Sequence, residues 1–324
     1  MPPVRVAVDA MGGDRAPGEI VAGAAAAASD DVAPVLYGPP DRLSALADGL
    51  PIVPAEQVVA MDEKPADAVR GKRESSLFLA CRAVGKGEAD AVVSAGNTGA
   101  TLAAALVEIR RLPAVHRPAI AVPLPAIGGP SVLLDAGANA DARPEHLVQF
   151  GYMGALFAEE ILGIEDPEVA LLSIGEEAEK GNRLVREAHA ALAASGLRFR
   201  GNVEGRDLLA RAADVVVSDG FTGNMALKLL EGTIRTTLDT FREEVTASVR
   251  GKLGGLLIRP AARTLSRRLD PETYGGAYLL GLRGLVVIAH GNSSRTAIAN
   301  AVRYAARGVR SRVVERLGDR LGAA

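Results

Sequence analysis

Residues 89–100, ADAVVSAGNTGA, and residues 213–224, ADVVVSDGFTGN, are two nearly matching stretches of this sequence. In each, an apolar run that follows an aspartate is typical of a buried parallel strand, and it leads into a glycine loop. Helical patterns follow the loops, from Thr101 to Ile109 and from Met225 to Glu231. This order of strand, loop and helix, found twice, predicts an α/β fold with parallel strands.

The two loops carry the same polar residues, which indicates a binding site. The matching positions are Ser94 and Ser218, Gly96 and Gly220, Thr98 and Thr222, and Gly99 and Gly223. Because a helix N-terminus faces each loop, its N–H groups and dipole favour negative charge there. We therefore expect both loops to bind one kind of ligand, an anion. The alternative is that small residues only let strand and helix pack closely.

Strands and helices are predicted to alternate along almost the whole chain. The expected strands are Val4 to Asp9, Pro34 to Tyr37, Ala91 to Ala95, Ala119 to Val122, Val132 to Asp135, Val169 to Ile174, Val215 to Ser218 and Leu285 to Ala289. The expected helices include Pro17 to Ala28, Glu145 to Leu162, Arg183 to Ala194 and Arg295 to Ala306. This order predicts a doubly wound, mostly parallel α/β/α sheet, with ligands at the carboxyl ends of the strands.

The composition indicates an enzyme-sized α/β protein with a large core. The chain has 324 residues, of which 48% are hydrophobic and 3% aromatic. One domain with an excursion and two intimate lobes both fit this length, and we expect a single catalytic domain over residues 1–324. A net charge of −2 gives no general attraction to nucleic acid, so we expect no nucleic-acid partner. The single Cys81 excludes a disulfide framework and is expected in the core.

No targeting, membrane-spanning or metal motif is recognisable. The four histidines have no metal-ligand spacing, no run of about 18 apolar residues is present, and the N-terminus leads directly into a strand. We therefore expect a cytoplasmic protein with no bound metal. Asp9, Asp14 and Asp135 offer oxygen ligands for Mg²⁺, but strand-end aspartates more often accept hydrogen bonds from turns, which is the reading we favour.

The loops that follow the predicted strands contain no cofactor or hydrolase fingerprint. Residues 9–14, 135–139 and 175–182 each combine glycine with polar side chains at a strand end. Their spacing matches neither G-x-G-x-x-G, nor a P-loop, nor a G-x-S-x-G elbow. NAD, ATP and a serine hydrolase triad are therefore unsupported, and no cofactor is expected.

Basic residues occur where an anion would need them. Residues 64–76 are expected to place Lys64, Arg70, Lys72 and Arg73 on a loop before a helix start at Ser75 or Ser76. A serine at that point caps the helix or helps to hold phosphate. The alternative for the basic residues is that they only form a solvent-exposed surface. Lys180 lies inside a loop after a strand, and Lys228 follows Asn224 by four residues, facing the same loop or the solvent.

Seven motifs in order along the chain resemble those of bacterial PlsX-type phosphate acyltransferases. They are DAMGGD (9–14) followed by Ala16 and Pro17, SAGNTGA (94–100), LDAGAN (134–139), IGEE (174–177) with KGN (180–182), GNVEGRD (201–207), DGFTGN (219–224) and HGNS (290–293). The resemblance covers nearly the whole chain. It implies a fold related to phosphotransacetylases and isocitrate dehydrogenase-like enzymes.

The resemblance also implies a reaction and partners. Acyl-[acyl carrier protein] and inorganic phosphate would give acyl phosphate and free carrier protein, at the start of phospholipid synthesis. The implied assembly is a homodimer, peripherally associated with the membrane, that passes acyl phosphate to a membrane glycerol-3-phosphate acyltransferase.

Phosphate is itself the nucleophile in such a reaction, so no general base is obligatory. The enzyme must position phosphate at the thioester carbonyl and donate hydrogen bonds to the developing oxyanion. We expect Lys180 and Asn224 to be catalytic; covalent catalysis through Ser94, Ser218 or Cys81 is less attractive, because no histidine is near them in sequence. The expected phosphate- or substrate-binding residues are Asp9, Gly12, Gly13, Asp14, Lys64, Arg70, Lys72, Ser75, Ser76, Ser94, Asn97, Thr98, Gly99, Asn139, Gly181, Asn182, Asp219, Thr222, Gly223, Lys228 and His290.

Residues 246–269 form a basic amphipathic segment that is expected to protrude. Six cations and several leucines occur there without an acidic residue, and Gly251, Gly254, Gly255 and Pro260 predict two short helical pieces. A dimer contact, a dock for the acidic carrier protein and a membrane contact are the competing uses, beside an ordinary surface excursion.

Three other functions stay open on the sequence. A short-chain phosphotransacetylase would use acyl-coenzyme A, a decarboxylating dehydrogenase of related fold would need a nicotinamide and a metal, and a membrane scaffold would need no catalysis.

Overall fold

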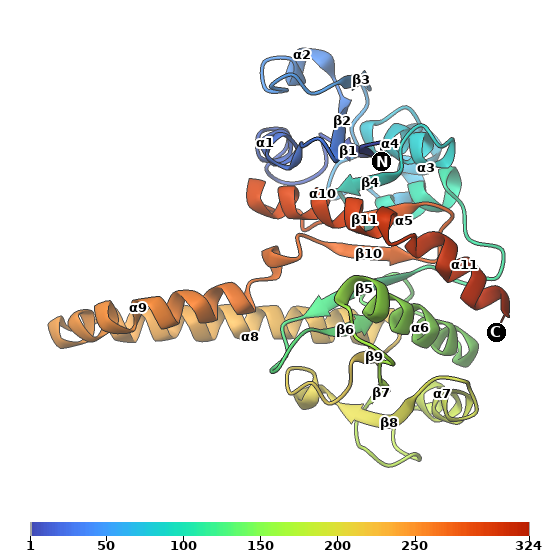
Figure 1. The fold of residues 1–324 in the computed structure, drawn as a ribbon, viewed down its shortest axis with the longest axis vertical. Helices are drawn as coiled ribbons and strands as arrows, with labels where there is room; N and C mark the ends of the chain where they lie inside the picture. Colours follow the sequence, from blue (N-terminus) through green and yellow to red (C-terminus); the bar gives the residue numbers. More distant parts are fainter. Residues whose placement is uncertain (1, 324) are drawn as a thin grey trace.

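The computed structural model describes residues 2–323, which form an eleven-stranded sheet with helices on both faces (Figure 1). The strand order is β3-β2-β1-β4-β11-β10-β5-β6-β9-β7-β8. The bounds are β1 Val4–Asp9, β2 Val32–Gly38, β3 Ile52–Pro54, β4 Ala91–Ser94, β5 Ala119–Leu124, β6 Ser131–Leu134, β7 Val169–Ser173, β8 Phe199–Glu204, β9 Val215–Val217, β10 Ala277–Leu280 and β11 Leu285–Ile288.

The sheet consists of two parallel blocks that run in opposite directions. Strands β3, β2, β1, β4 and β11 are mutually parallel and form what we call the first lobe. Strands β6, β9, β7 and β8 are also mutually parallel and form the second lobe. Between them, β10 and β5 pair antiparallel with their neighbours. The predicted mostly parallel sheet is confirmed, whereas its antiparallel centre was not anticipated.

Helices cover the two faces because successive side chains of each strand point to opposite sides. On β1, Val6 and Val8 pack with α1 and α10 in one core, while Ala7 packs with α4 and α5 in the other. The helices are α1 Gly18–Ala27, α2 Pro40–Leu43, α3 Pro65–Gly71, α4 Ser76–Gly85, α5 Thr98–Glu108, α6 Pro144–Phe157, α7 Arg183–Ala193, α8 Gly220–Thr246, α9 Val249–Leu269, α10 Arg295–Arg310 and α11 Val313–Ala323. The π-helical turn η1 Ala158–Leu162 continues α6, and short 3₁₀ turns lie at η2 Gly205–Asp207 and η3 Pro271–Thr273.

The aspartate that opens each matching stretch has the same structural role in both lobes. Asp90 Oδ2 accepts the main-chain N–H of Arg5 at 2.7 Å, and Asp214 Oδ2 accepts that of Glu168 at 3.0 Å. Each carboxylate therefore joins the amino ends of two neighbouring strands.

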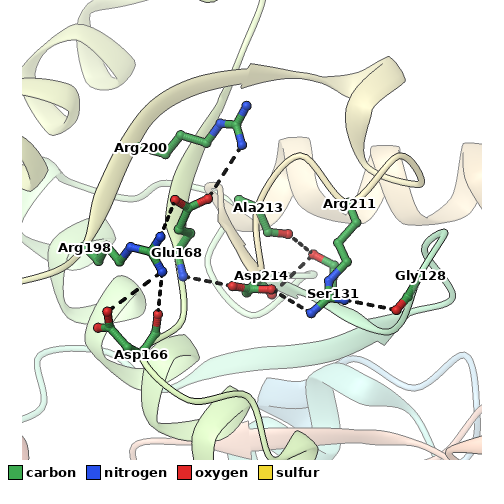
Figure 2. A network of polar contacts seen from close by, with 9 residues as sticks. All are labelled: Gly128, Ser131, Asp166, Glu168, Arg198, Arg200, Arg211, Ala213 and Asp214. Atoms are coloured by element: carbon green, nitrogen blue, oxygen red, sulfur yellow. Dashed lines mark hydrogen bonds and ion pairs between the residues drawn. The ribbon is translucent and has the colours of Figure 1, made fainter.

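In the second lobe this joint belongs to a larger polar network (Figure 2). Arg211 pairs with Asp214 at 3.0 Å, and the Ser131 hydroxyl donates to the carbonyl oxygen of Ala213 at 2.8 Å. Glu168 in turn pairs with Arg198 at 2.9 Å and with Arg200 at 3.6 Å. These contacts hold the amino ends of β6, β7, β8 and β9 together. The network does not involve the loops at the carboxyl ends of these strands.

Helices α8 and α9 form a hairpin that projects from the body, and we call it the arm (Figure 1). A side chain at Gly251 would overlap the carbonyl oxygen of Val245, so the two helices approach closely because this residue is glycine. The expected protruding segment is present, but residues 249–269 form one 21-residue helix that contains Pro260, not two pieces. Pro260 cannot donate a main-chain hydrogen bond, and α9 packs along α8. Among residues 2–323, no helix is long and apolar enough to cross a membrane.

Two further expectations are corrected. Residues 65–71, expected in a loop, form helix α3, which packs against α5 through Pro65 and Gly99. Strands β3, β8 and β10 were not predicted, because short strands at an edge or in an antiparallel centre have weak patterns of their own. The expectation that Cys81 lies in the core is confirmed, since it is fully buried.

Candidate functional site

The first group of candidate residues surrounds Asp9, at the carboxyl end of β1. Asp9 is 2% exposed and accepts hydrogen bonds from the hydroxyls of Ser76 at 2.6 Å and Ser94 at 2.8 Å. Burial raises the pKa of Asp9, although these hydroxyls and the N–H groups of Met11 and Gly12 oppose the shift. The carboxylate is thus occupied by hydroxyl groups of α4 and β4 in addition to the N–H groups of its own turn, which were the partners expected for such a strand-end aspartate.

Gly12 and Gly13 bring the Asp9 loop close to the loops after β4 and β11. A Cβ at Gly12 would lie 2.5 Å from Asp9 Oδ2 and 2.8 Å from the nitrogen of Gly96. Gly13 has a φ of 111° and lies against Gly291, whose carbonyl oxygen accepts the N–H of Asp14 at 2.7 Å. Asp14 itself is exposed. Small residues are therefore required here by packing.

The loop after β4 ends at the N-terminus of α5. Asn97 caps this helix by accepting the N–H of Ala100 at 2.9 Å, and its amide donates to the carbonyl oxygen of Met61 at 2.7 Å. The N–H groups of Thr98 and Gly99 form no hydrogen bond within the described part of the chain. Thr98 is exposed, so this helix end has two donors available to an anion.

The basic residues of the 64–76 segment have different surroundings. Lys72 Nζ lies 2.6 Å from Glu63 Oε2 and donates to the carbonyl oxygen of Val58 at 2.8 Å, so its charge is already paired. Lys64 and Arg70 are exposed at the two ends of α3 and form no ion pair within residues 2–323. Ser75, at the start of α4, is buried with its hydroxyl unpartnered among the described residues.

A second group lies at the carboxyl ends of β6, β9 and β7 in the second lobe. Asp135 is fully buried and accepts the N–H groups of Ile120, Gly137, Ala138 and Asn139 at 2.8–3.1 Å. Burial raises its pKa against these bonds. The amide of Asn139 donates to Asp135 and to the carbonyl oxygen of Pro118, so this side chain also serves the turn.

Asp219 begins α8 and accepts both the N–H of Thr222 at 2.9 Å and its hydroxyl at 2.8 Å. The N–H groups of Gly220 and Gly223 are bonded to the carbonyl oxygens of Asn139 and Asp219. A side chain at Gly223 would overlap the carbonyl oxygen of Asp135. The start of α8 is therefore closed to an anion at most of its main-chain donors, which favours the packing interpretation of Gly223.

Asn224 differs from these neighbours because its amide is not used by the fold. It is half-buried, lies against Gly137, and forms no side-chain hydrogen bond within residues 2–323. Gly137 has a φ of 139°, and a Cβ there would lie 3.6 Å from the Asn224 side chain. The amide is thus positioned by close contact and remains available to a substrate.

Lys180 lies in the loop between β7 and α7, beside the end of β9, since β7 and β9 are paired. Its main chain is fixed, because its N–H donates to Glu177 at 3.0 Å and Asn182 caps α7 by accepting the N–H of Val185 at 2.9 Å. Gly181 takes a φ of 100° between them. The Lys180 side chain is exposed and has no ion pair in the described chain. An ordered loop thus presents a free ammonium group.

His290 follows β11 and contacts α8, where its Nε2 lies 3.2 Å from Glu231 Oε1. Burial disfavours the ionised form of Glu231, but the hydrogen bond and charge of His290, with Lys228 and Arg235, outweigh it and lower the pKa. Sequence reasoning missed Glu231, because its pairing depends on how α8 crosses between lobes. Lys228 is exposed on α8.

The candidates therefore form two groups rather than one ring of donors around a single phosphate. Glu231 is eleven residues beyond Gly220, which corresponds to about 16 Å along α8. The second-lobe group comprises Asn139, Lys180, Gly181, Asn182, Asp219, Thr222, Gly223 and Asn224. The other candidates, except Lys228 on α8, belong to the first lobe.

Covalent alternatives are disfavoured by this geometry. Burial and the charges of Asp9 and Glu108 raise the pKa of Cys81, which keeps its thiol protonated. Ser94 is buried and donates its hydroxyl to Asp9, and Ser218 donates to the carbonyl oxygen of Asp219. Within residues 2–323, no three His, Cys, Asp or Glu side chains are arranged to hold a metal ion.

Comparison with known proteins identifies the family. A family model described as "Fatty acid synthesis protein" matches residues 4–316. The chain belongs to this family. It is 46% identical over 327 residues to the phosphate acyltransferase of Heliobacterium modesticaldum, covering 98% of each chain. It is 49% identical to that of Thermobifida fusca, covering 97% of this chain and 90% of the other. The resemblance to phosphate acyltransferases is thereby confirmed, and the family is one of acyltransferases.

Solved structures confirm the fold class. A phosphotransacetylase from Streptococcus pyogenes superposes with a TM-score of 0.63 at 17% identity, over 97% of this chain and 94% of the other. The EutD phosphotransacetylase from Staphylococcus aureus gives 0.60 at 16% identity, over 95% and 94%. At this level of identity the similarity concerns the fold.

Proposed function

We propose that this protein transfers an acyl group from acyl-[acyl carrier protein] to inorganic phosphate, with Lys180 and Asn224 at the reacting carbonyl. The observation that carries the proposal is that the ammonium group of Lys180 and the amide of Asn224 follow two neighbouring strands, β7 and β9. Neither side chain is used by the fold within the described residues, whereas Asp135, Asn139 and Asp219 are. The full-length similarity to named phosphate acyltransferases supports the reaction class.

In the proposed step a phosphate oxygen attacks the thioester carbonyl carbon. The tetrahedral intermediate then expels the thiolate, so a C–O bond forms and the C–S bond breaks. Lys180 and the Asn224 amide would stabilise the oxyanion, which is the charge that develops in the transition state. Phosphate is substantially dianionic near neutral pH and needs no general base. The thiolate leaves without obligatory help, and Lys180 or water supplies its proton.

We assign the first-lobe group to an anionic part of the donor substrate. Its free Thr98 and Gly99 N–H groups, with exposed Lys64 and Arg70 on the adjoining α3, favour negative charge. Attacking phosphate must touch the carbonyl, and Asn224 lies about 10 Å along α8 from Glu231, which contacts His290 of the first-lobe group. One phosphate therefore does not serve both.

Trapping of acyl phosphate with hydroxylamine tests this proposal. The purified protein is incubated with phosphate and palmitoyl-[acyl carrier protein], and hydroxamate is measured; we expect formation that depends on both substrates. The second candidate function is that of a short-chain phosphotransacetylase, the activity named for two proteins of similar fold. A parallel reaction with acetyl-coenzyme A distinguishes the two, because only a phosphotransacetylase should prefer that thioester. Absence of hydroxamate with either thioester would reject phosphate acyl transfer.

We further propose a cytoplasmic homodimer that associates peripherally with the membrane and supplies a glycerol-3-phosphate acyltransferase. The arm supports the membrane contact. Helix α9 has no buried residue, and Val249, Leu253, Leu256 and Leu257 are 64–83% exposed beside its cations. Such a face suits an anionic lipid surface.

A further inference from the structure

A cationic hollow lies in the first lobe between α1, β2 and α10, on elements that carry none of the candidate site residues. Its volume is about 510 Å³. Its walls include Arg303, Arg307 and Arg310, which recur on one face of α10, and its floor includes Ala27, Val32 and Ala306. Helices α1 and α10 lie side by side in Figure 1. Three arginines thus surround a small apolar floor.

Two of the arginines are fixed by main-chain oxygens. Arg303 donates to the carbonyl oxygen of Ala26, and Arg310 donates to that of Asp31 at 2.9 Å. The Asp31 carboxylate is 3.5 Å from Arg310 and is 74% exposed, so it compensates little of the charge. Among residues 2–323 it is the one acidic residue that lines the hollow. A net positive charge therefore remains.

Arg307 lies between these two on α10, and its exposed guanidinium is the one of the three that no oxygen atom of the described residues holds. Within residues 2–323 its guanidinium forms no hydrogen bond and no ion pair. Arg307 and Arg310 lie in the last turn of α10, where the helix dipole favours a cation, whereas Arg303 lies one turn earlier. Three guanidinium groups at one hollow match a phosphate group, because each guanidinium can donate two parallel hydrogen bonds to two phosphate oxygens.

The hollow is separate from the candidate site. Val32 in its floor pairs with Val4 at the amino end of β1, five residues before Asp9. Five residues of strand correspond to about 17 Å. A ligand in the hollow therefore does not contact the loops at the carboxyl ends of the first-lobe strands.

We infer that this hollow binds a small phosphorylated molecule, with its phosphate on the three arginines and an apolar part over Ala27, Val32 and Ala306. The inference does not depend on the proposed function. Inorganic phosphate alone would satisfy only the arginines, whereas the alanine and valine floor favours a phosphate ester with an apolar group.

Calorimetric titration with phenyl phosphate and with inorganic pyrophosphate, at about 0.15 M ionic strength, tests the inference. We expect saturable binding of phenyl phosphate at one site. Arg307→Gln should weaken it by about tenfold or more, because it removes a charge-assisted contact. Arg186→Gln, an exposed arginine on α7, is the matched control and should leave binding unchanged. Thermal unfolding of each variant checks that the fold is retained.

Lys180→Ala distinguishes the hollow from the candidate catalytic group. Binding that survives Lys180→Ala and is lost in Arg307→Gln supports the inference. The inference is overturned if no saturable binding is seen, if Arg186→Gln weakens binding as much as Arg307→Gln does, or if only Lys180→Ala abolishes it. Pyrophosphate that binds more tightly than phenyl phosphate would overturn the role of the apolar floor.

Discussion

The Nε2 atom of His290 lies 3.2 Å from Oε1 of Glu231, and this contact joins the loop after β11 to the middle of α8. His290 follows a first-lobe strand, whereas α8 starts at a second-lobe strand. The Glu231 side chain is 23% exposed. Its contact with His290 shows that the first half of α8 extends from the second lobe to the first. The pair therefore helps to set the relative position of the two groups of candidate residues.

We predict that Glu231→Gln lowers the free energy of unfolding at about pH 6 by less than about 1 kcal/mol. The folded pKa of Glu231 is below its ordinary value of 4.5. Its ionised form thus stabilises the fold above the unfolded pKa, and this contribution is lost as the pH falls through the folded pKa. Urea unfolding between about pH 6 and about pH 3 should show the two proteins converging at low pH. Glu56→Gln, an exposed glutamate, is the control; a difference that persists at about pH 3 would contradict the prediction.

Lys180→Ala is expected to lower kcat for acyl phosphate formation by about 10²-fold, since it removes one cation from a preorganised anion site. The side chain is exposed and its loop is held by main-chain bonds, so the fold should be unaffected. The measurement is steady-state hydroxamate formation at saturating phosphate. Lys86→Ala, at the end of α4 in the first lobe, provides a matched lysine control. Near-normal turnover of Lys180→Ala would remove this residue from the catalytic set.

Two glycines of α8 should respond oppositely to alanine. At Gly223 a Cβ would overlap the carbonyl oxygen of Asp135, so Gly223→Ala should destabilise the protein by about 1–3 kcal/mol. At Gly232 nothing lies within 4 Å of an added Cβ, and alanine there should stabilise the helix by about 0.5–1 kcal/mol. Thermal unfolding of both variants measures this. Equal changes in stability for the two variants would show that the contact between Gly223 and the carbonyl oxygen of Asp135 does not determine the effect of alanine there.

The sequence predicted local features well and long-range ones poorly. The strand ends at Asp9 and Asp135 depend on neighbouring residues, so motifs and patterns identify them. The caps at Asn182 and Asp219 were not predicted, because these residues were expected to bind phosphate or substrate. The pairing of Glu231 with His290 depends on strand order, which no local pattern encodes. The antiparallel centre of the sheet likewise comes from packing of β10 between β11 and β5.

The matching glycine loops illustrate the limit of motif reasoning. Both contain the same serine, glycine and threonine positions, yet the N–H groups of Thr98 and Gly99 have no partner among residues 2–323, whereas those of Gly220, Thr222 and Gly223 are hydrogen-bonded. The difference arises because Asp219 caps α8 at Thr222 and Gly223, whereas Asn97 caps α5 two positions later in the motif, at Ala100 and Thr101. One loop is therefore the better candidate for an anion, which the sequence alone did not distinguish.

The last prediction is that the arm binds anionic membranes through α9. Six cations without an acidic residue lie between positions 246 and 269, and Leu257 is 83% exposed. Each lysine or arginine near an anionic surface contributes about 1 kcal/mol, screened within about 8 Å at physiological salt. Binding should therefore be reversible and should weaken as salt is added.

Co-sedimentation with liposomes that contain anionic lipid measures this binding. Leu257→Glu removes an insertion contact, and changing Arg259, Arg263 and Arg267 together to Glu removes the net positive charge of residues 246–269. Both variants should pellet less than the parent, whereas Leu46→Glu, an exposed leucine outside the arm, should pellet as the parent does. Light scattering checks that the oligomeric state is unchanged. If both arm variants pellet like the parent, α9 is not the membrane contact, and packing between copies or docking of the carrier protein explains its exposed face better.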